Sequence, residues 1–193
     1  MIQSNKKYIH WDYYLAIEDD LKNLARYIDF SDSNYLTYSI ELARILQITC
    51  SEIDVVSKLL CEKIDSSKKY IDINDYKKQL SNSIPSIITE KVYSKRYWLE
   101  LNPFINWNNN INPDWWSSYN LVKHKRNINF HEANLKNVLN AVAGLLIIIV
   151  NYYLKDFSSN NNIKDLFHDI SNNSKESEFF TLEDSYYYHR LVV

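Results

Sequence analysis

The sequence predicts an all-α fold, a bundle of roughly four to five main helices followed by a poorly defined C-terminal tail. The first reason is glycine content. Gly144 is the single glycine among 193 residues, so tight β-hairpins and the glycine-rich phosphate loops of Rossmann or Walker-type sites are not expected. The second reason is apolar spacing at three- and four-residue steps over long stretches. The third is the apolar run at 141–150, which predicts a helix buried on all sides.

The first half of the chain reads mainly as helix. Apolar residues follow helical spacing over residues 10–29 and again over residues 34–65, which predicts an amphipathic helix and then a long one. Asn74 is expected to open a short helix that ends before Pro85, because proline does not continue a helix. Residues 86–101 are rich in β-branched and aromatic side chains, which favours a strand, although no partner strand is evident.

The second half is expected to start with a loop at residues 102–114. Asn112 followed by Pro113 resembles a helix cap followed by proline at the first helical position, with a helix through residues 115–122. The next helix is expected at residues 130–157.

The start of that helix matters most for function. The sequence Asn-Phe-His-Glu at residues 129–132 resembles a capping box with Asn in place of Ser or Thr. This places His131 in the first turn of a buried helix. The apolar part of the helix is shorter than the roughly 18 residues that span a bilayer, so no membrane segment is expected.

The chain is expected to divide into a helical bundle at residues 1–170 and a C-terminal tail at residues 171–193. Within the first part, residues 158–162 read as a loop and residues 163–170 as a short helix. Residues 1–7 are polar and no apolar segment follows them, so a signal peptide is not expected.

Net charge and cysteine placement indicate which partners and which cellular compartment to expect. The formal net charge of −2 gives no overall attraction to nucleic acid or membrane, so any basic site must be local. Cys50 and Cys61 would lie about 16 Å apart along one helix, which is too far for a disulfide. Both are expected to be reduced core thiols of a cytoplasmic protein.

Residues 119–134 hold the most informative cluster of polar side chains. It comprises Lys123, His124, Lys125, Arg126, Asn127 and His131. Three interpretations compete: a metal site formed by the two histidines, a solvated charged surface, and a site for phosphate chemistry. No carboxylate or third histidine stands at helical spacing to complete a metal site, and Glu132 is expected to act as a helix cap, so no metal is expected.

Phosphate chemistry is the most specific of the three. A helix N-terminus presents free backbone N–H groups and the positive end of the helix dipole, so His131 would lie where anions bind. Arg126 would end the preceding helix and offer a planar guanidinium to phosphate oxygens. A helix break between them is required, because residues five apart on one continuous helix point to different faces.

The stretch Arg-Asn-Ile-Asn-Phe-His from Arg126 to His131 matches the R-x4-6-H motif of the HEPN superfamily, including the polar residue directly after Arg. Residues 115–145 resemble the region around that motif, and residues 34–65 resemble its earlier long helix. The resemblance implies a HEPN-like helical bundle, often dimeric. Many such proteins are metal-independent endoribonucleases of toxin–antitoxin and phage-defence systems, so the resemblance implies that Arg126 and His131 are the catalytic pair. Ala133 stands where HEPN toxins paired with small nucleotidyltransferases carry tyrosine, so modification there is not expected.

The expected function is RNA cleavage without metal or cofactor, by attack of the 2′-hydroxyl on the adjacent phosphate. His131 would act as general base or acid, and Arg126 would stabilise charge on the phosphorane. The supporting RNA contacts would be Lys123, His124, Lys125 and Asn127, with Trp116 available to stack bases. Expected partners are RNA, a second copy of the chain and an antitoxin or other defence-system protein. The alternative is a non-catalytic HEPN-like helical module that binds a protein or nucleotide partner.

The sequence also predicts which of three aromatic and two acidic side chains are exposed. Trp115 and Tyr119 are expected in the core, whereas Trp116 points elsewhere and is the better candidate for exposure. Glu52 and Asp54 are expected on the solvated face of their helix. The alternative is that either one orients the motif arginine or a histidine from a neighbouring helix.

A homodimer is expected, because one Arg and one His are few groups for cleaving RNA and a slightly negative chain attracts RNA poorly. Two-fold pairing would bring two copies of residues 123–131 to one groove. Gly144 costs about 1 kcal/mol relative to alanine inside a helix, which suggests close helix approach within the bundle or across the dimer. The helix at 139–153 and the adjacent Trp116 are the expected interface.

Overall fold

The computed structural model describes residues 8–156 and 163–182, and it confirms a mainly α-helical protein. The described part holds six α-helices and one two-stranded sheet. The helices are α1 (Ile9–Leu24), α2 (Ile40–Ile64), α3 (Ile73–Ser83), α4 (Asp114–Asn129), α5 (Leu135–Leu154) and α6 (Ile163–Asn173). The strands are β1 (Val92–Ser94) and β2 (Leu99–Leu101). The loop expected at 158–162 lies outside the described residues.

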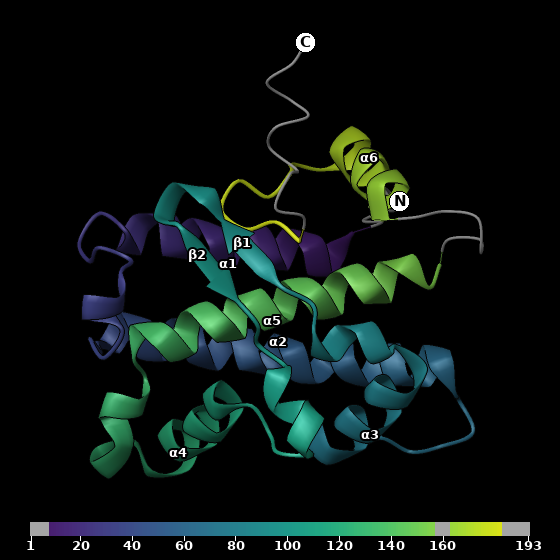
Figure 1. The fold of residues 1–193 in the computed structure, drawn as a ribbon, viewed down its shortest axis with the longest axis horizontal. Helices are drawn as coiled ribbons and strands as arrows, with labels where there is room; N and C mark the ends of the chain where they lie inside the picture. Colours follow the sequence, from purple (N-terminus) through teal and green to yellow (C-terminus); the bar gives the residue numbers. More distant parts are fainter. Residues whose placement is uncertain (1–7, 157–162, 183–193) are drawn as a thin grey trace, which may run out of the picture.

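Helix α5 forms the centre of the molecule (Figure 1). It runs alongside α2, with α1 on one side of this pair and α3 and α4 on the other. Fifteen of its 20 residues are buried, which confirms the prediction of a helix buried on all sides. At 20 residues α5 is long and apolar enough to cross a membrane, so the expectation that it is too short is wrong. However, 78% of its apolar window is buried inside the protein, as in the core helix of a soluble protein.

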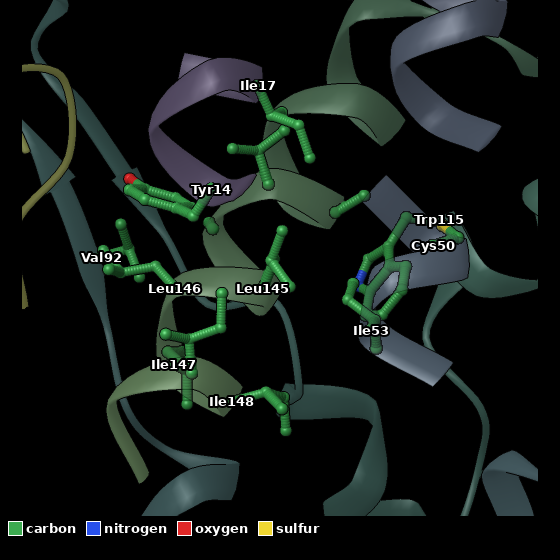
Figure 2. Close-up of a cluster of buried hydrophobic side chains, with 14 of the residues drawn as sticks. Tyr14, Ile17, Cys50, Ile53, Val92, Trp115, Leu145, Leu146, Ile147 and Ile148 are labelled. Atoms are coloured by element: carbon green, nitrogen blue, oxygen red, sulfur yellow. The ribbon is translucent and has the colours of Figure 1, made fainter. Parts of the chain in front are cut away.

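Figure 2 shows that side chains on different sides of α5 pack against neighbouring elements. The side chains of Leu145–Ile148 point in different directions, among Tyr14 from α1, Ile53 from α2, Trp115 from α4 and Val92 from β1. Burying a Leu or Ile side chain contributes about 1.5–3 kcal/mol relative to leaving it exposed. The apolar run therefore contributes substantially to the packing energy of the bundle.

Capping side chains decide where the helices begin. Helix α2 starts after Ser39 rather than at residue 34, and α3 starts after Asp72 rather than at Asn74, because each side chain accepts backbone N–H groups of the following turn. At α4 the cap position is taken by Pro113 itself, without a side-chain cap, so the cap expected from Asn112 is wrong.

The segment at 86–101 forms a small hairpin. Strands β1 and β2 pair with each other in antiparallel register, with Val92 opposite Leu101. The strand prediction is thus met by two short strands, and the missing partner lies within the same segment. The connection is made without glycine: Trp98 has a φ of 54°, which bulky residues rarely adopt, and its side chain is 93% exposed.

The chain returns to α1 and β1 through residues 174–182. Glu18 of α1 is 1% exposed and lies under this segment. Its carboxylate accepts hydrogen bonds from the Ser177 hydroxyl and from the N–H groups of Glu178 (3.0 Å), Phe179 (3.0 Å) and Phe180 (3.4 Å). Thr181 exchanges two backbone hydrogen bonds with Tyr93, at 2.8 and 2.9 Å. The stretch expected as a tail therefore packs against the bundle as far as residue 182, and residues 183–193 lie outside the described part.

Candidate functional site

The cationic segment lies at the end of α4. The helix is not continuous there, because Lys125 has φ −143° and ψ 49°, outside the helical region. This break precedes Arg126 and so does not lie between Arg126 and His131; the two residues are separated by the end of α4 at Asn129 and the 3₁₀ turn that follows it. The five side chains of the segment are all exposed: Lys123, His124, Lys125, Arg126 and Asn127.

His131 lies in a 3₁₀ turn (Phe130–Glu132) that precedes α5. The expectation that it occupies the first turn of the buried helix is wrong, because Asn134 rather than Asn129 caps α5. Protein acceptors occupy the first N–H groups of α5: Leu135 donates to Thr37 O (2.9 Å), Lys136 to Tyr35 O (3.1 Å) and Asn137 to Asn134 Oδ1 (3.1 Å). These N–H groups are not free for an anion, so phosphate binding near His131 must rely on side chains.

A buried polar network anchors the turn beside His131. Ser118 Oγ donates to Glu132 Oε2 (2.7 Å), and Asn137 Nδ2 donates both to Ser118 Oγ and to the Glu132 carbonyl, each at 2.9 Å. The other carboxylate oxygen, Glu132 Oε1, lies 3.5 Å from His131 Nε2. A fixed carboxylate therefore faces the imidazole. Glu132 therefore does not cap the buried helix, as its sequence position predicted, but lies beside His131, and its place next to that histidine in the sequence was a usable signal.

The segment before α2 holds the same turn from the other side. Tyr38 pairs with Asn134 in an isolated antiparallel bridge, and its ring packs edge-on against Phe130 with the centroids 5.4 Å apart. The backbone of the turn is thus held between α4 and residues 35–38. The His131 side chain is nevertheless 62% exposed.

Arg126 and His131 are both accessible to solvent, and neither is buried against the core. Among the described residues, the Arg126 guanidinium makes no hydrogen bond or ion pair, so it is free to bind an anion. An exposed imidazole beside a fixed carboxylate can accept and return a proton. The neighbouring cations can hold phosphate.

A cavity of about 460 Å³ opens between α2, the start of α3 and α4. The lining is mainly polar and includes Asp54, Asp72, Asn112, Trp116, Tyr119 and Lys123. Lys123 belongs to both this cavity and the cationic segment, whereas Arg126 and His131 do not line it. The cavity leaves no signal in the sequence, because its walls come from three separate segments.

The tryptophans are placed differently from the prediction. Trp115 and Tyr119 are buried, as expected, but Trp116 is only 7% exposed, so the expectation that it is open for stacking is wrong. Its ring packs against those of Trp115 and Tyr119, with centroids 5.9 and 5.3 Å away. The exposed tryptophan is Trp98 of the hairpin.

The two acids of α2 have partners other than Arg126 and His131. Glu52 Oε1 is 2.6 Å from Nδ1 of His10 on α1. This agrees with the alternative prediction that one of these acids orients a histidine on a neighbouring helix. Asp54 accepts a hydrogen bond from the Tyr76 hydroxyl at 3.1 Å. Both carboxylates are half-buried rather than fully solvated.

Gly144 provides close approach inside the bundle. A Cβ at this position would lie 3.3 Å from Trp115, 3.4 Å from Phe104 and 3.5 Å from Pro103. The helix at 139–153 and Trp116 are buried within the chain, so their expected role as a dimer interface is wrong. Any dimer interface must therefore lie on another surface of the chain.

The cysteines behave as expected: Cys50 and Cys61 are both free and buried. Burial, with smaller contributions from nearby Asp75 and Glu62, raises the pKa of Cys61 to about 12. Burial alone raises the pKa of Cys50 well above its ordinary value. Neither thiol is therefore a nucleophile at neutral pH.

Within residues 8–156 and 163–182, no three His, Cys, Asp or Glu side chains gather so that they could hold a metal ion. Comparison of the chain with family models, curated proteins and solved structures gives no match.

Proposed function

We propose that the protein is a metal-independent endoribonuclease of the toxin or phage-defence type, acting in the cytoplasm, and that Arg126 and His131 carry the reaction. The observation that supports this most is the turn between α4 and α5. An exposed imidazole lies there beside a fixed carboxylate, and an exposed arginine follows the break at Lys125. The match to the HEPN motif supplies the class of reaction.

The reaction proceeds by attack of the RNA 2′-hydroxyl oxygen on the adjacent phosphorus. The hydroxyl proton passes to a base, the bond from phosphorus to the 5′-oxygen breaks, and that oxygen takes up a proton. The products are a 2′,3′-cyclic phosphate and a 5′-hydroxyl. His131 performs one of the two proton transfers, and Arg126 stabilises the negative charge on the phosphorane.

The remaining residues position the reactants. Glu132, anchored by Ser118, holds the imidazole orientation. The RNA backbone is held by Lys123, His124, Lys125 and Asn127, all of which are exposed. Trp116 does not belong to this exposed surface, because it is buried and lines the neighbouring cavity instead.

The test compares cleavage of labelled RNA by purified wild type and His131→Ala, in buffer containing EDTA. We expect wild type to cut and leave 2′,3′-cyclic phosphate ends, with His131→Ala slower by at least about 100-fold. His168→Ala is the matched control, because His168 is an exposed histidine on α6. Equal cleavage by wild type and His131→Ala would contradict the proposal. Loss of wild-type cleavage in EDTA with recovery in Mg²⁺ would do the same.

We also propose that two copies of the chain act together, through exposed apolar side chains beside the motif. Leu36 is 79% exposed, Ile40 is 80% exposed and Ile128, which lies within the motif, is 65% exposed. Exposed apolar clusters are often interaction sites, and a two-fold contact here would pair the two motifs. Light scattering should show a dimer for wild type and a monomer for Ile128→Asp. A wild-type monomer at micromolar concentration would contradict the pairing.

A further inference from the structure

The cavity between α2, α3 and α4 differs in charge from the cationic segment next to it. Its lining includes the carboxylates of Asp54 and Asp72, whereas Lys123 is its basic residue. Lys123 also belongs to the cationic segment, so it links the cavity to the segment that carries Arg126. An acidic lining repels phosphate, so the cavity is unsuited to the RNA backbone and suited to a group that offers hydrogen-bond donors.

The polar atoms of the lining are held in defined positions. Asp54 Oδ1 accepts from the Tyr76 hydroxyl (3.1 Å), and Asp72 Oδ1 accepts from the N–H of Asn74 (2.8 Å). The second oxygen of each carboxylate makes no hydrogen bond among the described residues. Both are therefore available as acceptors, and an ionised carboxylate can only accept.

Asn112 offers the cavity a hydrogen-bond donor rather than an acceptor. The Lys77 ammonium donates to Asn112 Oδ1 at 3.3 Å, and an ammonium can only donate. The oxygen of the amide is thus identified, and its NH₂ group is left as the donor that Asn112 can offer to the cavity. Lys77 is itself buried and also donates to the Asn110 carbonyl (2.8 Å), which holds this arrangement in place.

We infer that this cavity binds a guanine base of the RNA substrate, an inference that rests on the proposed ribonuclease activity and names its base preference. Guanine presents two adjacent donors, N1–H and N2–H₂, which match the Asp54 carboxylate, and its O6 matches the Asn112 donor. Adenine and cytosine place an acceptor nitrogen beside their amino group, and uracil has carbonyls on both sides of its single N–H, so each would turn an acceptor toward a carboxylate.

The size and walls of the cavity agree with this assignment. A volume of about 460 Å³ lies within the range of small-molecule sites, about 300–1,000 Å³. The rings of Trp116 and Tyr119 form part of the wall, against which a flat base can pack. Lys123 remains at the border to hold the phosphate of the same nucleotide.

Calorimetric titration with the four nucleoside 3′-monophosphates tests the assignment without requiring cleavage. We expect guanosine 3′-monophosphate to bind wild type at least about tenfold more tightly than the other three, since hydrogen bonds to an ionised carboxylate are stronger than bonds between neutral groups. Asp54→Asn keeps the shape but loses an acceptor, and it should abolish the preference. Asn112→Asp, which keeps the contact with Lys77, should weaken guanosine binding about tenfold.

Glu62→Gln is the control, because it removes one negative charge from an exposed position of α2 that does not line the cavity. It should bind all four nucleotides as wild type does. Equal affinity of wild type for the four nucleotides, or no binding, overturns the inference.

The two proposals fail in different ways. Guanosine preference that depends on Asp54, without RNA cleavage that depends on His131, supports the guanine cavity and refutes the ribonuclease. Cleavage that depends on His131, with no guanosine preference in binding or at the cut sites, refutes the guanine cavity and leaves the ribonuclease intact.

Discussion

Replacing Glu18 by glutamine should destabilise the protein far more than the loss of one surface charge would. The carboxylate is 1% exposed. One oxygen accepts from the N–H groups of Phe179 and Phe180, and the other from the N–H of Glu178. Glutamine has nearly the same size but only one oxygen. In either orientation its NH₂ group therefore faces at least one backbone N–H.

The expected cost follows from these contacts. At least one hydrogen bond to a charged group is lost, which contributes about 1.5–3 kcal/mol, and a buried N–H is left without an acceptor. The bonds that remain are weaker because the acceptor is now neutral. We expect Glu18→Gln to lower the free energy of unfolding by about 2–4 kcal/mol, measured by urea denaturation followed by circular dichroism.

Asp19→Asn provides the comparison for this experiment. Asp19 is next to Glu18, its side chain is 68% exposed, and its ion pair is a surface contact with Lys22 at 3.2 Å. Such pairs contribute about 0–1 kcal/mol, so this variant should unfold close to wild type. If Glu18→Gln and Asp19→Asn agree within about 0.5 kcal/mol, the buried carboxylate does not hold the C-terminal segment and the reasoning is refuted.

Three further predictions concern other parts of the molecule. Gly144→Val should lower stability by about 1–3 kcal/mol in thermal unfolding, because the added atoms press on Trp115; an unchanged melting temperature would contradict the packing argument. Cys50 and Cys61 should react with a thiol reagent at pH 8 only after unfolding in urea. Fast labelling of the folded protein would contradict the burial of the two thiols. For Cys61 the pKa is raised from 9.0 to about 12, so its contribution to stability is present below pH 9 and is lost as pH rises toward 12. Arg126→Lys should cut RNA at least about tenfold more slowly in the labelled-RNA assay, because lysine lacks the planar fork that binds two phosphate oxygens; full activity would reduce Arg126 to a general electrostatic role.

The helical core could be predicted from sequence because its signal is local and strong. The run in α5 and the spacing in α2 can be buried only as helices, and α5 lies at the centre with α2 beside it. The hairpin was harder, because its strands are three residues long and its turn relies on Trp98 at a positive φ instead of glycine.

The candidate site could be predicted in composition but not in placement. Asn129 and Asn134 both suit a helix cap by sequence, and the choice between them depends on residues 35–38, which bond to the start of α5. Those residues are far away in the chain, so no local pattern could reveal the contact. Trp116 is a different case, because its ring packs against those of Trp115 and Tyr119 on its own helix, so a local signal for its burial was present in the sequence.

The return of residues 174–182 to α1 has a consequence for how the protein is made. The acceptor on Glu18 leaves the ribosome 160 residues before its donor at Glu178, which corresponds to about 8–32 s of synthesis at 5–20 residues per second. During that time α1 carries a carboxylate that cannot be buried without its partners. Docking of α1 onto α5 should therefore finish only after residues 177–180 have emerged, and nascent chains stalled before Ser177 should remain sensitive to protease within α1.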